Sequence, residues 1–186
     1  VDFLRRTIDF AAALGAQRLV FGSPKNRVRG PLSIGEATAA ASEVFRELGE
    51  HAHARGAVLC IEANPTGYGC DFITTTHEAI EMCRTIDHPG IGVNGDLGGM
   101  TMAGESVATA IASAARYLAH FHASEPNLAE MGTAANGEKR SDHAGAASAL
   151  AAVGYDGWVS VEMRQAGGGG TLAAVERALR RARALY

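Results

Sequence analysis

Four short apolar runs in this chain each end in a side chain that can bind a metal ion. The runs cover residues 58–62, 91–96, 119–122 and 158–162, and they end in Glu62, Asp96, His122 and Glu162. The last residues are separated by 34, 26 and 40 positions (62 to 96, 96 to 122, 122 to 162). Each separation is long enough for a loop, a helix and a second loop, the usual connection between parallel strands. The pattern therefore predicts parallel strands that end at one edge of a sheet.

Helical patterns separate the predicted strands along the chain. Ser33 with Glu36 forms a capping-box pattern, and Ser141-Asp142 can cap a later helix. We expect helices at 3–14, 33–56, 76–86, 105–118, 142–154 and from 171, strands at 18–21, 58–62, 91–96, 119–124 and 158–163, a loop at Gly98-Gly99, and a connector at the glycine run 167–170. Strands that alternate with helices indicate βαβ units, whose active sites form at the carboxyl ends of the strands.

Alternation along the strands divides their side chains between two faces. If the four terminal side chains point one way, the opposite face is apolar throughout, with Leu59, Ile61, Ile91, Val93, Ala119, Phe121, Val159 and Val161. Asn94, His120 and Ser160 then share the face of the terminal residues. Leaving such groups buried without a partner costs roughly 1 to 3 kcal/mol each. We therefore expect them to hold the metal ligands in place.

Composition limits the classes of partner. The chain has 186 residues, of which 47% are hydrophobic and 20% charged, so we expect a single domain over residues 1–186. A net charge of −3 argues against nucleic acid or an anionic membrane, which require clustered positive charge. No apolar run approaches the length of a membrane span. Three cysteines without a CxxC spacing suit a reducing cytoplasm.

The start of the chain gives a separate expectation. Residue 1 is Val1, and the sequence opens inside a helical pattern. We therefore expect a preceding part of a longer protein. A partial sheet of this kind can pair through its open edges, which favours a homo-oligomer.

The chemistry of the terminal residues indicates which ion they would bind. Two glutamates, one aspartate and one histidine form an oxygen-rich set that favours one divalent ion, Mn²⁺, Mg²⁺ or Co²⁺, in open octahedral coordination. A closed structural zinc site prefers thiolates and more histidines, although Zn²⁺ stays an alternative. A single acidic residue at a strand end is more often a cap than a ligand. Four successive strand ends of ligand type favour the metal site.

Several stretches resemble a known family. IEANP (61–65), DLGG (96–99), HFHASE (120–125) and GYDGWVSVE (154–162) are similar to the xylose isomerase-like TIM-barrel superfamily, and within it to the sugar phosphate isomerase/epimerase group that includes the ketose 3-epimerases. The resemblance implies a (β/α)8 TIM barrel that lacks its three N-terminal βα units. It also implies that Glu62, Asp96, His122 and Glu162 bind the metal, with Glu62 and Glu162 as the acid/base pair.

Two positions depart from the ketose 3-epimerase pattern. That pattern has a histidine three residues after the ligand aspartate, where this chain has Gly99, and a substrate-binding glutamate six residues after the first ligand, where it has Tyr68. The superfamily is therefore better supported than the reaction.

The residues suit enediolate chemistry on a small carbohydrate. A metal ion that chelates a carbonyl and an adjacent hydroxyl acidifies the neighbouring C–H, so one carboxylate can remove the proton and the other can return it. We expect a metal-dependent isomerase or epimerase of a small sugar, polyol or sugar phosphate. Two alternatives stay open: an inosose dehydratase-like lyase on the same metal site, and a non-catalytic barrel fragment.

Further side chains near the strand ends are candidates for substrate contacts. Lys25 and Arg27 can meet a phosphate or carboxylate, although solvated loop charges explain them equally well. Asn64 and Tyr68 can touch substrate, with a turn as the alternative for Asn64. The others are Glu125 and Arg164, which can bond sugar hydroxyls or each other, and His143, for which a structural role is favoured.

Overall fold

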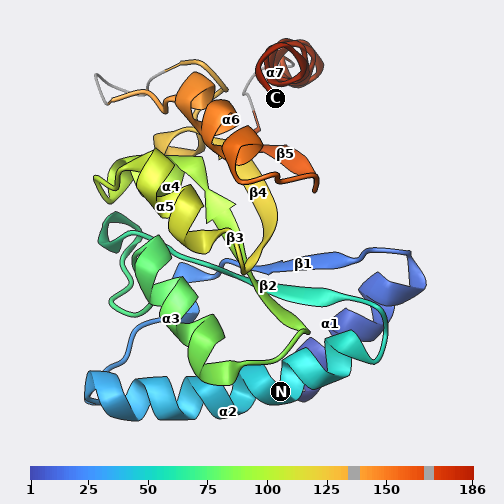
Figure 1. Cartoon of the computed structure of the whole chain (residues 1–186), viewed down its shortest axis with the longest axis vertical. Coiled ribbons are helices and arrows are strands. Elements are labelled where there is room, and N and C mark those ends of the chain that lie inside the picture. The colour runs from blue at the N-terminus through green and yellow to red at the C-terminus, as the bar shows by residue number, and fades with distance from the viewer. Residues whose placement is uncertain (134–138, 166–169) are drawn as a thin grey trace.

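Five parallel strands form the sheet of the computed structural model, which describes residues 1–133, 139–165 and 170–186 (Figure 1). The strands are β1 (Arg18–Phe21), β2 (Val58–Glu62), β3 (Ile91–Asp96), β4 (Leu118–Ser124) and β5 (Val159–Glu162). They lie side by side in chain order, and every neighbouring pair is parallel. This confirms the predicted α/β fold with five strands of a TIM barrel.

Helices connect consecutive strands and cover one side of the sheet. They are α1 (Asp2–Ala13), α2 (Ile34–His53), α3 (Thr76–Ile86), α4 (Leu97–Met102), α5 (Val107–Ala114), α6 (His143–Ala152) and α7 (Thr171–Leu185), with short 3-10 turns η1 (Pro24–Asn26), η2 (Thr66–Tyr68) and η3 (Pro126–Leu128). Ser33 and Glu36 form the predicted capping box of α2, and Asp142 caps α6. The predicted connector 167–170 lies outside the described residues except for Gly170.

Helix α4 corrects a sequence expectation, because Gly98-Gly99 lies in a helix and not in a loop. Two glycines disfavour a helix by about 1 kcal/mol each. One local and one tertiary contact offset this cost: Asp96 caps the helix by accepting a hydrogen bond from the amide of Gly99, and the amide of Gly98 donates to the Ser124 hydroxyl at 2.8 Å.

The apolar face of the sheet packs under the helices as predicted. Leu59, Ile61, Ile91 and Val93 lie in one core with residues of α2 and α3. Phe121 is fully buried in a second core with residues of α4, α5 and α6. Because this face is committed to the cores, the polar face of the strands is left for the functional site.

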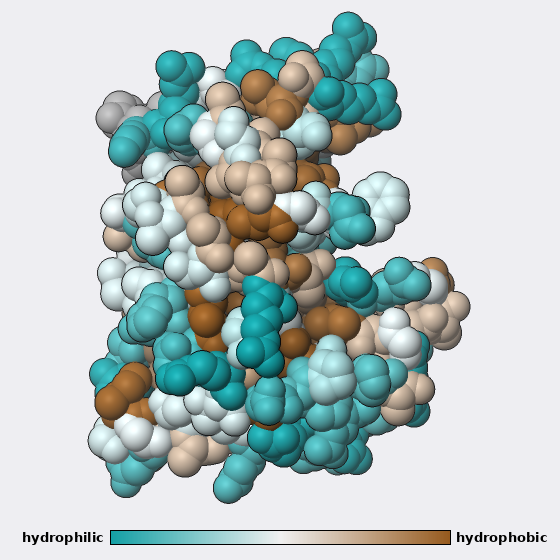
Figure 2. Space-filling model, in the orientation of Figure 1, coloured by the Kyte–Doolittle hydropathy of each residue, from teal (hydrophilic) through white to brown (hydrophobic). Residues whose placement is uncertain are grey.

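The sheet does not close into a barrel. A TIM barrel has eight strands, whereas this sheet has five and ends at β1 and β5. Figure 2 shows a notch in the outline between the part that carries β5 and α7 and the part that carries β1 and α1. Among the described residues, no helix is long and apolar enough to cross a membrane.

Candidate metal centre

Glu62, Asp96, His122 and Glu162 converge at the carboxyl end of the sheet. Each offers one ligand atom, and these four atoms all lie within 4.8 Å of one another. The side chains of Glu62, Asp96 and His122 are only 10 to 12% exposed, whereas that of Glu162 is 42% exposed. The centre is thus buried on three sides and open toward β5.

The strand register explains how four residues from four strands reach the same level. Glu62 pairs with Asn94, two residues before Asp96, while Asp96 pairs with His122. His122 in turn pairs with Ser160, two residues before Glu162. Strands in a barrel are tilted and staggered, so residues at one height along its axis are offset in register.

The imidazole of His122 lies at the middle of the set. Its Nδ1 is 3.1 Å from Glu162 Oε2, 3.2 Å from Glu62 Oε2 and 3.7 Å from Asp96 Oδ2. One nitrogen thus faces an oxygen from each of three carboxylates. An ion with carboxylate and imidazole ligands needs the same convergence of donor atoms.

The charges of the cluster alter the pKa of its members. Burial lowers the pKa of His122, but the hydrogen bonds and negative charges of Glu162 and Glu62 outweigh burial and raise it to about 10. Burial raises the pKa of Asp96 to about 7, and the charge of Glu62 adds to that increase. The imidazolium of His122 therefore neutralises part of the negative charge that a cation would otherwise balance.

Neutral donors fix the two inner carboxylates, and a buried cation holds the backbone at the ends of β1 and β2. Asn94 Nδ2 donates to Glu62 Oε2 at 2.6 Å, as the face prediction required, and Ser124 Oγ donates to Asp96 Oδ2 at 2.6 Å. Arg27 is 3% exposed and donates to the backbone carbonyls of Glu62 and of the end of β1. This corrects the expectation that Arg27 meets a ligand phosphate or carboxylate. The role of Ser124 was not predicted, although its position two residues after His122 on the same face was a usable signal.

His120 differs from expectation. It is 8% exposed, and its Nδ1 has no hydrogen-bond partner in the described part of the chain. Its ring instead packs edge-on against the His122 ring, with centroids 5.2 Å apart. His120 therefore contacts His122 through its ring, and no hydrogen bond from its Nδ1 holds the cluster.

Two of the predicted substrate residues lie near the four ligands. Burial raises the pKa of Tyr68, as do the nearby charges of Asp96 and Glu162, while Arg164 acts in the opposite direction. The phenol is thus within electrostatic range of the cluster and of the exposed Arg164.

The other predicted substrate residues also follow the carboxyl ends of strands, but only Lys25 among them is exposed. Lys25 is exposed in η1, after β1. Asn64 is 4% exposed, and its amide donates to the carbonyl of Glu62 at 3.3 Å, which fits the turn alternative. Glu125 is fully buried, and its carboxylate makes hydrogen bonds within the protein. One of its partners is His143, for which the sequence favoured a structural role. The structure therefore does not bring Glu125 to the centre.

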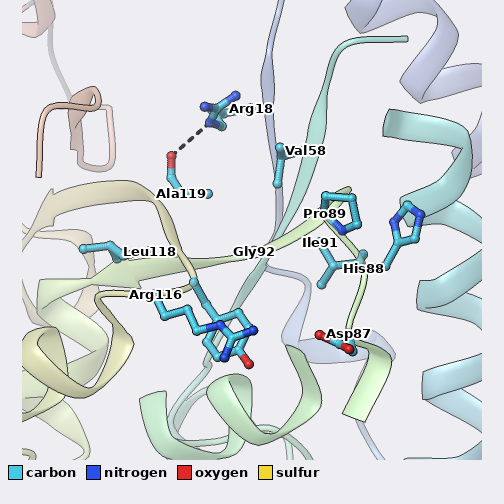
Figure 3. A pocket seen from close by; sticks show the side chains of 11 residues that line it. Arg18, Val58, Asp87, His88, Pro89, Ile91, Gly92, Arg116, Leu118 and Ala119 are labelled. Atoms are coloured by element: carbon cyan, nitrogen blue, oxygen red, sulfur yellow. Dashed lines mark hydrogen bonds between the residues drawn. The ribbon is translucent and has the colours of Figure 1, made fainter. Parts of the chain in front are cut away.

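A separate pocket lies at the opposite end of the sheet. It has a volume of about 440 Å³ and is lined by residues at the starts of four strands, including Arg18, Val58, Ile91 and Leu118. Arg18 crosses this end and donates to the carbonyl of Ala119 at 3.1 Å (Figure 3). Since it contains none of the four ligand residues, the pocket is separate from the metal centre.

Comparison of the sequence with protein-family models identifies the family of this chain. The model for the xylose isomerase-like TIM barrel matches residues 1–185. The chain belongs to this family. No curated protein gives a significant match to the sequence.

Solved structures share the fold of this xylose isomerase-like chain at low sequence identity. They include the D-psicose 3-epimerase of Clostridium cellulolyticum H10 (20% identity, TM-score 0.79, covering 99% of this chain and 69% of that one). The D-allulose 3-epimerase of Methylomonas sp. is similar (20%, 0.82, 100% and 68%), as is the 3-keto-D-glucoside 4-epimerase of Escherichia coli (21%, 0.80, 97% and 69%). The chain thus spans a little over two thirds of each relative.

The donor set of this xylose isomerase-like barrel fits a divalent cation. Three carboxylates and one imidazole lie within 4.8 Å of one another in a largely buried setting. Neutral hydrogen-bond donors already fix two of the carboxylates. These are the requirements of an oxygen-rich metal site with ordered ligands.

Proposed function

We propose that the chain is an enzyme, a divalent-metal-dependent isomerase or epimerase of a small sugar, polyol or sugar phosphate. The observation that carries this proposal is the convergence of Glu62, Asp96, His122 and Glu162 within 4.8 Å at the carboxyl end of the strands. Family membership and the epimerase names of the structural relatives support the same choice.

In the proposed site the four converging residues hold one ion, Mn²⁺, Mg²⁺ or Co²⁺ in preference to Zn²⁺. When bound, the ion supplies Lewis-acid polarisation of a carbonyl and stabilises negative charge on its oxygen. His122 provides a neutral imidazole nitrogen, which requires loss of the proton that the metal-free cluster retains. Asn94 and Ser124 keep the carboxylates of Glu62 and Asp96 oriented.

Glu62 and Glu162 carry the proton-transfer steps in this proposal. They extend from β2 and β5, with β3 and β4 between them, and both approach the same nitrogen of His122. One carboxylate removes the proton from the carbon next to the substrate carbonyl, and the other delivers a proton to the opposite face. Tyr68 and Arg164 contact the substrate hydroxyls or a phosphate.

The proposal also includes a cytoplasmic location and assembly into a homo-oligomer. The three cysteines, Cys60, Cys70 and Cys83, are buried and free, which suits a cytoplasmic enzyme. The open edges of the sheet favour a homo-oligomer. A carbohydrate is the proposed partner of the site, because the oxygen ligands and the two flanking carboxylates suit a polyhydroxylated substrate.

Solvent deuterium exchange tests the proposed reaction. The chain is incubated in D₂O with Mn²⁺ and D-allulose, and NMR follows deuterium incorporation next to the carbonyl. We expect exchange that EDTA abolishes, that added Mn²⁺ restores, and that Glu162→Gln lowers by at least 100-fold. Glu176→Gln, an exposed change on α7, is the control and should retain the rate.

Two results would decide against this assignment. A chain that binds Mn²⁺ but catalyses no exchange on any of a panel of ketoses and ketose phosphates would contradict the epimerase. A product that has lost a hydroxyl, detected as a deoxy ketone, would replace it with the dehydratase-like lyase.

A further inference from the structure

Glu125 is a buried acidic residue that the proposed reaction does not use. It follows His122 by three positions, and its side chain is 0% exposed. Burying a carboxylate is costly unless hydrogen bonds and charge compensate for the lost water. The partners of Glu125 therefore indicate what the residue does.

Three groups surround the Glu125 carboxylate. Oε1 accepts a hydrogen bond from the amide of Gly132 at 2.7 Å and lies 3.1 Å from His143 Nε2. Oε2 accepts from the amide of Ser141 at 2.7 Å. Burial raises the pKa of Glu125, but the hydrogen bonds from His143, Ser141 and Gly132 outweigh burial and lower it. A charged carboxylate thus ties Gly132, Ser141 and the start of α6 together.

The segment 126–132, which ends at this clamp, contacts both proposed substrate residues. The Tyr68 hydroxyl hydrogen-bonds to the backbone of Asn127. The amide of Arg164 donates to the carbonyl of Leu128 at 2.8 Å. The segment therefore links the Glu125 carboxylate to the Tyr68 hydroxyl and to the backbone of Arg164.

The backbone of this segment is held in an unfavourable conformation. Asn127 and Leu128 both have a φ of 57°, in the left-handed region that costs non-glycine residues roughly 1 to 3 kcal/mol. Such a conformation persists only where surrounding contacts enforce it. The two amides bound by Glu125, one of them at the end of the segment, supply such contacts.

We infer that Glu125 is a positioning residue for substrate binding, which acts through segment 126–132 on Tyr68 and Arg164. This inference rests on the proposed function of the same site. The Glu125 carboxylate makes no hydrogen bond to the four metal ligands among the described contacts. Its loss should therefore weaken substrate binding without weakening metal binding.

The isosteric variant Glu125→Gln tests the inference, because its amide group must face at least one of the donors that the carboxylate accepts from. We expect the backbone amides of 127–132 to exchange with D₂O at least tenfold faster. The KM for D-allulose should rise at least tenfold, while kcat stays within threefold and the Kd for Mn²⁺ within twofold. Glu176→Gln is the control, because it makes the same chemical change at an exposed position of α7 outside the segment; it should leave all four values within twofold.

The readouts separate the two proposals. Faster amide exchange in Glu125→Gln, with a wild-type chain that turns over no ketose, would retain the clamp and reject the proposed reaction. Wild-type amide protection in Glu125→Gln, or a loss of Mn²⁺ affinity as large as the rise in KM, would overturn the inference.

A second variant, His143→Gln, removes only one hydrogen-bond partner of the Glu125 carboxylate. If Glu125→Gln does not fold, faster exchange at 127–132 in His143→Gln supports the clamp, and unchanged exchange overturns it.

Discussion

At the scale of single residues, each inner carboxylate of the metal centre has one oxygen fixed by a neutral side chain. Asn94 donates to Glu62 at 2.6 Å, and Ser124 donates to Asp96 at 2.6 Å. Neither donor competes for a cation, since an amide nitrogen and a hydroxyl hydrogen carry no negative charge. The carboxylates are therefore ordered before an ion arrives, which reduces the entropy lost on binding.

Replacing Asn94 should weaken metal binding. Asn94→Ala removes the donor to Glu62, and changes of this kind around metal ligands typically cost about 10- to 100-fold in affinity. Titration calorimetry with Mn²⁺ measures the change, and Asn26→Ala in the exposed η1 turn is the control. An unaltered Kd in Asn94→Ala would show that Glu62 is held without this hydrogen bond.

The metal-free chain should lose stability as the pH rises. The folded-state pKa of His122 is about 10, against an ordinary value of 6.5. Because the folded-state pKa is raised, the ion pairs of His122 contribute fully to the free energy of unfolding below pH 6.5. This contribution is lost as the pH rises through 10. We expect the Tm in EDTA to fall between pH 7 and pH 9.5.

His122→Asn should show a smaller fall in Tm over that range, whereas the exposed control His53→Asn should keep the full fall. Saturating Mn²⁺ should oppose the fall, because the ion binds the neutral imidazole. A Tm in EDTA that rises with pH would contradict the assigned charge of His122.

Sequence alone predicted that Glu62, Asp96, His122 and Glu162 converge, because each ends an apolar run and the ends of parallel strands meet at one edge. It did not identify the buried role of Arg27 or the clamp at Glu125. Both side chains follow strand ends, where a charged residue is ordinarily solvated. Arg27 donates to the carbonyl of Ile73, 46 residues further along the chain. Glu125 accepts from the amide of Ser141, which lies 16 residues further along and is brought close by the folded loop. Periodicity contains no information about such contacts.

At the scale of elements, α4 shows how tertiary contacts override local preference. This helix has six residues, two of them glycine, so its sequence reads as a loop. Gly98 lies so close to the end of β4 that an added Cβ would be 2.6 Å from the carbonyl oxygen of Glu125. The first turn of α4 therefore packs directly against the strand that carries His122.

Gly98→Ala should destabilise the fold. Crowding against a fixed backbone costs about 1 to 3 kcal/mol, which exceeds the gain of about 0.5 to 1 kcal/mol from replacing a helical glycine. Gly35→Ala in α2 is the control, because an added Cβ there meets nothing within 4 Å, and it should stabilise. Urea unfolding measures both. A gain in stability for Gly98→Ala would mean that α4 can move away from β4.

At the scale of the whole molecule, the sheet has two open edges, β1 and β5. Unpaired strand edges promote association with other chains. Trp158, which directly precedes β5, is 79% exposed, and an aromatic side chain of this size adds apolar area to that edge. The order of the strands was predictable from the alternation of elements.

Residues 1–186 should self-associate in solution. Sedimentation velocity at tens of micromolar should give a mean mass above the 19.3 kDa of one chain. Trp158→Glu should shift it toward the monomer, because a charge at the edge opposes pairing. Leu172→Glu changes an equally exposed side chain on α7 and should have little effect. A monodisperse monomer in the parent chain would refute the prediction.

The order of β2 to β5 along the chain also sets the order in which the four residues of the cluster are synthesised. Its ligands come from consecutive strands, and Glu162 follows His122 by 40 residues. A chain emerging from the ribosome therefore presents three ligands well before the fourth. Only the docking of β5 brings Glu162 beside the other three residues, so the proposed site is completed after β2, β3 and β4 have paired.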